Sequence, residues 1–72
     1  MSSSQQKYLM TSSDGQEEEF RTISDGAALS KMITKATGST EDWDLWYVGA
    51  AQNEHIAAIR QDDEGLSIEA RI

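Results

Sequence analysis

The chain has 72 residues, which is enough for one small domain and too few for separate catalytic and regulatory domains. Thirteen acidic and six basic side chains give a net charge of −7, which disfavours nucleic acid and anionic membranes as partners and favours basic proteins. The absence of cysteine excludes disulfides, thiolate metal sites and thiol catalysis, and it fits a reducing compartment.

The first five residues, 1–5, are small and polar, and we expect a disordered N-terminus there. The start of the chain lacks the basic and apolar regions of a signal peptide, and no apolar run approaches the roughly 18 residues that span a bilayer. We therefore expect a single domain over residues 6–72, in a soluble cytoplasmic protein. A hydrophobic content of 38% predicts a thin core for this domain. Dimerisation would increase the apolar surface that the domain buries.

The domain begins with a pattern typical of a β-hairpin. Two runs of apolar and β-favouring side chains flank turn-forming residues, and these runs are Lys7–Thr11 and Glu17–Ile23. A two-residue turn would place Leu9 opposite Phe20, whereas a three-residue turn with Gly15 in the left-handed region would place Tyr8 there. We prefer the three-residue turn, because it brings four side chains to one face of the sheet, namely Tyr8, Met10, Phe20 and Thr22.

One helix follows the hairpin. Ser24 and Asp25 are both good N-cap residues, and the helix is predicted to end near Thr37, with Gly38 as a left-handed terminator. Apolar residues recur at the spacing of one helical stripe, namely Ala28, Leu29, Met32, Ile33 and Ala36. A narrow stripe of this kind is typical of a helix that lies on a sheet.

The second half of the chain predicts three more strands. The first is aromatic and β-branched, which indicates a central strand, and Gly49 near its end suggests a kink. The last strand alternates, with Leu66, Ile68, Ala70 and Ile72 on one face, so we expect that face to be buried. The three strands span Trp43–Ala50, His55–Arg60 and Leu66–Ile72.

These elements define the fold class as α+β, a two-layer sandwich of order β-β-α-β-β-β in which one helix packs on one face of an antiparallel sheet. We expect the core to contain Leu29, Met32, Ile33, Phe20, Leu45, Ile56 or Ile59, Leu66 and Ile68. Leu29→Ala or Ile33→Ala should each cost roughly 2–4 kcal/mol if the residue is buried.

The sequence offers little support for catalysis. His55 is the only histidine, and we interpret it as a surface or rim imidazole beside Glu54 rather than a general base. Asp62, Asp63 and Glu64 could gather around a hard cation, but a strand follows Gly65 where a metal loop would continue, so we favour a solvated turn. The glycines show no phosphate-binding spacing, and we expect no cofactor, no metal and no enzymatic activity.

The two tryptophans are three residues apart on one predicted strand, so they must point to opposite faces of the sheet. If Trp43 shares the helix-covered face with Leu45, then Trp46 projects from the open face beside Asp44. An exposed tryptophan beside acidic residues is typical of an interaction site. The alternative, weighted equally, is that the stems of Arg60 or Arg71 half cover this ring.

The acidic residues cluster in the sequence, and three consecutive glutamates lie on a predicted strand, where glutamate is disfavoured. Solubility and protection of a strand edge are the simpler explanation for this run, and a functional surface is the other. As a protein-binding site we predict Glu17, Glu18, Glu19, Glu41, Asp42, Asp44 and Trp46.

Three functions remain open. The leading hypothesis is a small, acidic, non-enzymatic protein that binds a basic surface on another protein, such as one that normally holds nucleic acid. In size and charge alone the chain resembles the small acidic inhibitors that phages and plasmids encode against restriction or CRISPR machinery, which implies nucleic-acid mimicry and an inhibitory role. The second is a homodimeric or larger assembly module, in which the open sheet face or an edge strand pairs with its own copy. A small metal-dependent enzyme that uses His55 and Asp62 comes last.

Overall fold

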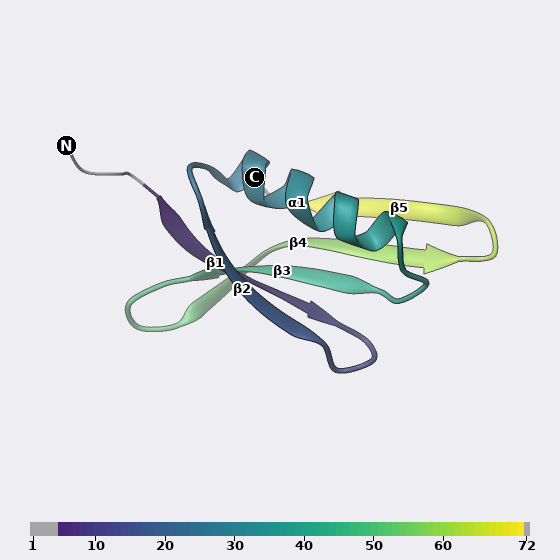
Figure 1. The fold of residues 1–72 in the computed structure, drawn as a ribbon, viewed down its shortest axis with the longest axis horizontal. Helices are drawn as coiled ribbons and strands as arrows, with labels where there is room; N and C mark the ends of the chain where they lie inside the picture. Colours follow the sequence, from purple (N-terminus) through teal and green to yellow (C-terminus); the bar gives the residue numbers. More distant parts are fainter. Residues whose placement is uncertain (1–4, 72) are drawn as a thin grey trace.

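The computed structural model describes residues 5–71 and confirms the predicted fold class. One helix packs on one face of a five-stranded antiparallel sheet (Figure 1). The expectations for residues 1–4 and for Ile72 lie outside the described residues. The elements are β1 (Gln6–Ser12), β2 (Glu17–Thr22), α1 (Asp25–Thr37), β3 (Trp43–Val48), β4 (Asn53–Asp62) and β5 (Gly65–Ala70).

The strand order in the sheet is β2-β1-β3-β4-β5, which confirms that β3 is the central strand. The β1–β2 hairpin and the β3–β4–β5 meander are joined by pairing of β1 with β3, and every neighbouring pair is antiparallel. The helix connects the two halves and lies across one side of the sheet. We call the opposite side, which no helix covers, the open face.

The first hairpin has the preferred register, in which Tyr8 lies opposite Phe20. The amide of Ser12 donates to the carbonyl oxygen of Gln16 at 3.0 Å, so three residues form the turn between them. Gly15 in this turn has a φ of 93°, a left-handed conformation that strongly favours glycine. The turn chemistry and the shared face of the aromatic side chains therefore agree on one register.

The helix begins where the sequence predicts, because the Ser24 hydroxyl accepts a hydrogen bond from the amide of Ala27 at 3.1 Å. Its predicted terminator is wrong in conformation, since Gly38 has a φ of −95° and is not left-handed. The last turn instead tightens, with the Gly38 amide bound to the carbonyl of Lys35 at 3.3 Å and the Ser39 amide to that of Ala36 at 3.0 Å.

The core lies between α1 and the strands beneath it. Met32 and Leu45 are fully buried as predicted, and Ile56 and Ile59 are both buried. Phe20, Leu29 and Ile33 are only partly buried at the margins of this cluster, because the line of α1 that is fully buried consists of Ala28, Met32 and Ala36. The buried apolar residues are Tyr8, Met10, Ala28, Met32, Ala36, Trp43, Leu45, Ile56, Ala57, Ala58 and Ile59.

The predicted burial of the last strand is wrong. Leu66 and Ile68 share the helix side of the sheet with the core, as their pairing with β4 requires, yet they are 38% and 42% exposed. A helix about 10 Å across covers two or three strands spaced about 4.8 Å apart, and the main contacts of α1 are with β2, β3 and β4. The prediction that Leu66 and Ile68 share one face of the sheet is confirmed, but α1 does not cover the strand that carries them.

The glycine at the end of β3 also has a different role from the predicted kink. Gly49 follows the strand and belongs to the β3–β4 turn, where its amide donates to the carbonyl oxygen of Gln52 at 3.2 Å. A Cβ atom at this position would lie 2.7 Å from the same oxygen. This turn therefore requires a residue without a side chain.

Candidate protein interface

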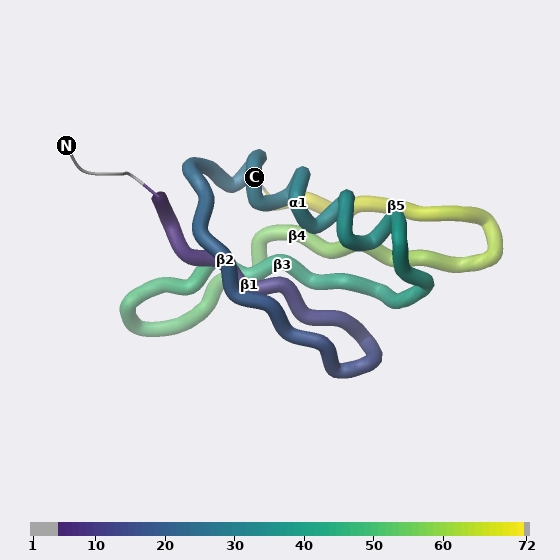
Figure 2. The backbone as a smooth tube through the Cα atoms, in the orientation of Figure 1, coloured from purple at the N-terminus to yellow at the C-terminus, as the bar shows by residue number. Residues whose placement is uncertain are grey.

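Three connecting segments come together at one end of the sheet, and together with the adjoining strand ends they carry seven of the thirteen acidic residues. Because neighbouring strands are antiparallel, the β1–β2 turn, the α1–β3 loop and the β4–β5 turn lie at the same end (Figure 2). We call this region the acidic end. Its carboxylates are Asp14, Glu17, Glu41, Asp42, Asp62, Asp63 and Glu64.

Hydrogen bonds hold the three segments of the acidic end in place. The Ser13 hydroxyl donates to Glu41 Oε1 at 2.7 Å and accepts from the amide of Asp42 at 3.1 Å. On the other side, Asp42 Oδ1 accepts a hydrogen bond from the amide of Gln61 at 2.9 Å. The Gln61 side chain also donates to the carbonyl oxygen of Glu41 at 2.8 Å. These contacts hold the Glu41 and Asp42 carboxylates between the β1–β2 turn and the end of β4.

Asp14 remains charged more readily than an ordinary aspartate. The Ser12 hydroxyl and the Gln16 amide group donate hydrogen bonds to its carboxylate and lower the pKa of Asp14. Glu64 is held by a similar local contact, since its amide donates to Asp62 Oδ1 at 2.9 Å. Local hydrogen bonds thus favour the ionised form of Asp14 and hold the Asp62 carboxylate in the β4–β5 turn.

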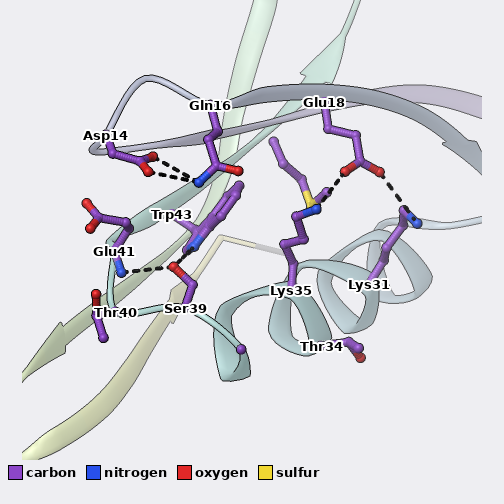
Figure 3. A pocket seen from close by; sticks show the side chains of 12 residues that line it. Asp14, Gln16, Glu18, Lys31, Thr34, Lys35, Ser39, Thr40, Glu41 and Trp43 are labelled. Carbon is purple, nitrogen blue, oxygen red and sulfur yellow. Dashed lines mark hydrogen bonds and ion pairs between the residues drawn. The ribbon is translucent and has the colours of Figure 1, made fainter.

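An open groove of about 830 Å³ runs between the acidic end and the C-terminal half of α1. Figure 3 shows Asp14 and Glu41 at one part of this groove, near Trp43, and Glu18 with the helix lysines at the other. Lys35 and Lys31 lie 3.2 and 3.7 Å from the Glu18 carboxylate oxygens, so Glu18 neutralises one of the two positive charges in this part of the lining. The groove therefore has an acidic part beside the β1–β2 turn and a part of mixed charge beside α1.

The three strand glutamates do not form one surface. Glu18 lies on the helix side, where it binds the two helix lysines, while Glu17 and Glu19 lie on the open face. Glu19 is 3.4 Å from Lys7 across the hairpin. Only Glu17 of the three contributes to the acidic end, and the run as a whole lines β2, the edge strand of the sheet.

The tryptophans lie on opposite faces as predicted, with Trp43 in the core and Trp46 on the open face. Trp46 is half-buried rather than free. Its Nε1 donates to the Thr11 hydroxyl at 3.0 Å, and its ring lies 4.9 Å from that of His55. The expected half-covering is thus present, but threonine and histidine provide it in place of the arginine stems.

Asp44 is the centre of a polar cluster on the open face that the sequence did not predict. Its Oδ1 lies 2.9 Å from His55 Nε2 and 3.2 Å from Arg60 Nη2. The interpretation of His55 as a neighbour of Glu54 is wrong, because adjacent strand residues point to opposite faces. A register shift between Leu45 and Trp46 places His55 beside Asp44, and strand alternation alone carries no signal of such a bulge.

We expect Asp44→Ala to lower the free energy of unfolding by about 1 kcal/mol, because the partly buried His55 and the exposed Arg60 lose a shared acceptor. Glu69→Ala, which removes an exposed acid from the same face, should change it by less than about 0.5 kcal/mol. Urea unfolding followed by circular dichroism measures both. Equal effects of the two substitutions would show that the cluster adds no stability.

Comparison with known protein families, with curated proteins and with solved structures gave no match to this chain. In the part of the chain that the structure describes, no helix has the length and apolar character needed to cross a membrane. Among residues 5–71, no three acidic, histidine or cysteine side chains converge in a way that could hold a metal ion. The acidic end and the open-face cluster are therefore the candidate sites that the geometry offers.

Proposed function

We propose that this chain is a small, non-enzymatic protein that binds a basic surface of another protein through its acidic end. The observation that carries the proposal is the gathering of seven carboxylates, from three connecting segments and the adjoining strand ends, at one end of the sheet. Fixed carboxylates of one sign speed the encounter with a basic partner and orient it. The net charge of −7 acts in the same direction.

The partner that suits this surface best is a protein whose basic site normally holds nucleic acid. Such a site is lined by lysine and arginine and is arranged to bind rows of phosphates. A group of carboxylates, four of them held by hydrogen bonds, presents comparable negative charge and competes for the same side chains. The proposed role is therefore inhibition by nucleic-acid mimicry in the cytoplasm, of the kind that small acidic phage and plasmid proteins direct against restriction or CRISPR machinery.

Within this proposal, the seven predicted site residues divide into three groups. Glu17, Glu41 and Asp42 belong to the acidic end and would make the main electrostatic contacts. Asp44 and Trp46 lie on the open face and would form a second contact area if the partner extends over the sheet. The other two, Glu18 and Glu19, are paired with lysines of this chain, so we assign them to the stability of the β2 edge.

Two matched variants test the proposal. The first replaces acids of the acidic end (Glu17→Gln, Glu41→Gln, Glu64→Gln), and the second replaces acids elsewhere (Glu19→Gln, Glu54→Gln, Glu69→Gln). Each removes three of the parent's negative charges, so both have a net charge of −4 in place of −7. We expect only the first variant to lose most of its association rate with a basic protein partner and most of its salt dependence.

The assay begins with capture of partners from lysate at low and high salt and proceeds to association kinetics with the purified partner. Both variants must unfold at temperatures close to that of the parent. Equal loss in the two variants would mean that net charge alone drives binding and that the acidic end is not a site. A partner whose binding does not compete with its nucleic acid would contradict the mimicry.

A further inference from the structure

The last strand, β5, is an edge strand that contributes little to the core of its own chain. Every residue of Gly65–Ala70 is exposed. Its apolar side chains nevertheless lie on one face, the helix side, because Ile68 is opposite Ile59 and Ala70 is opposite Ala57. With Leu66 they form an apolar stripe along the edge of the sheet that α1 does not cover.

The two edges of the sheet differ in how they are protected against pairing. Four of the six residues of β2 are charged, namely Glu17, Glu18, Glu19 and Arg21, and charges on an edge strand oppose the addition of another strand. In β5 only Glu69 is charged, and the chain contains no proline that could block its edge. The edge at β5 is therefore the one that can accept a further strand.

The backbone of β5 presents free hydrogen-bonding groups on its outer side. The amide of Arg71 donates to the carbonyl oxygen of Ile56 at 2.8 Å, which fixes the side of the strand that faces β4. Since these groups alternate along an antiparallel strand, those of Leu66, Ile68 and Ala70 point outward. The residues with outward backbone groups are thus the same ones that carry the uncovered apolar side chains.

We infer that this chain forms a dimer in which β5 pairs with β5 of a second copy, antiparallel and about a two-fold axis at Ser67. In this register Leu66 of one copy lies opposite Ile68 of the other, so four large aliphatic side chains cover one another on the helix side. The two sheets then continue as one, and the stripe that α1 leaves uncovered is buried.

Charge complementarity favours a second copy as the occupant. In the proposed register the turn at Asp63 and Glu64 comes beside Arg71 of the second copy, and this contact occurs twice by symmetry. Glu69 lies opposite Gly65, so no like charges meet across the strands. Because the β2 edge is charged, the assembly closes at two copies instead of growing into a filament.

The pairing involves only one short strand from each copy. The area that each copy buries is therefore less than the roughly 800 Å² per partner of a standard interface. We therefore expect a weak dimer, half formed at a concentration between about 10 μM and 1 mM. Sedimentation velocity of the full chain over this range measures the dimer dissociation constant. A parent protein that remains monomeric at about 1 mM would overturn the inference.

Two isoleucine variants locate the contact. Ile68→Lys is expected to raise the dissociation constant at least about tenfold, since it places a charge in the apolar stripe. Ile23→Lys is the matched control, because Ile23 is 69% exposed, follows the strand at the other edge and undergoes the same change of size and charge. Circular dichroism establishes that both variants are folded. Equal weakening by the two, or none by Ile68→Lys, would overturn the inference.

A charge reversal tests the register without changing the stripe. Arg71→Glu, at an exposed position after the strand, should weaken the dimer several-fold, and Asp63→Lys in the same chain should restore it. This pair remains informative if Ile68→Lys does not fold. An Arg71→Glu variant that dimerises like the parent, or a double variant without recovery, would contradict the register at Ser67.

Discussion

Trp43→Ala should unfold the domain at room temperature, whereas Trp46→Ala should leave it folded. Trp43 is 1% exposed and is the largest of the fully buried side chains, so its truncation costs about 3–5 kcal/mol. A single domain of this size has a total stability of only about 3–5 kcal/mol. Trp46 is half-buried on the open face, and its loss should cost about 1–2 kcal/mol.

Far-UV circular dichroism and urea unfolding distinguish these outcomes, and Trp43→Phe serves as the control. Phenylalanine keeps most of the apolar volume and loses the hydrogen bond from Trp43 Nε1 to the Ser39 hydroxyl, which is 3.3 Å long. We expect this variant to fold with reduced stability. Similar losses for the two alanine variants would contradict the assignment of one tryptophan to the core and the other to the open face.

The sequence predicted those parts of the fold that depend on local patterns. The boundaries of α1 follow from Ser24 as its N-cap and from one apolar stripe, and the structure has the same helix. The register of the first hairpin follows from Gly15 and from the face that Tyr8 and Phe20 share. Both features are set by residues close together in the chain, which is why pattern and spacing were sufficient.

Features that depend on contacts between distant elements were not predicted. The alternation of β5 is the same whether or not another layer covers it, so the sequence did not reveal that Leu66 and Ile68 are exposed. The cluster at Asp44 depends on a bulge that brings His55 to the open face. A pattern within one strand contains no information about either fact.

The acidic end was predicted in part, because it depends both on local sequence and on contacts between distant elements. Its residues were visible in the sequence as separate acidic clusters, and Glu41 and Asp42 were among the predicted site residues. Their convergence with Asp14 and with the β4–β5 turn depends on the pairing of β1 with β3, which the order of elements does not dictate. The chemical character of the site was therefore predictable, and its assembly at one end required the three-dimensional structure.

The parent should lose stability steeply in alkali, and Tyr8→Phe should remove much of that loss. Tyr8 is fully buried, and its hydroxyl donates a hydrogen bond to the Asp25 carboxylate at the start of α1. Burial, together with the hydrogen bond and the negative charge of Asp25, raises the pKa of Tyr8 well above its ordinary value of 10.0. Only the protonated phenol fits this site.

The sign of the effect follows from the proton bound in each state. Below pH 10 both folded and unfolded chains hold the Tyr8 proton, so the contribution of the raised pKa to stability is fully present. Above that pH the unfolded chain releases the proton while the folded chain keeps it, so stability falls as pH rises. Between pH 10 and pH 12 we expect the melting temperature of the parent to fall by about 10 °C more than that of Tyr8→Phe, since the linkage amounts to about 2 kcal/mol over this range. At pH 7 the variant should be about 1 kcal/mol less stable, because the hydrogen bond to Asp25 is lost.

Thermal melts at several pH values measure the difference, and Tyr47→Phe, which removes the neighbouring half-buried tyrosine, is the control. Parallel pH profiles for the parent and Tyr8→Phe would show that the Tyr8 proton does not stabilise the fold.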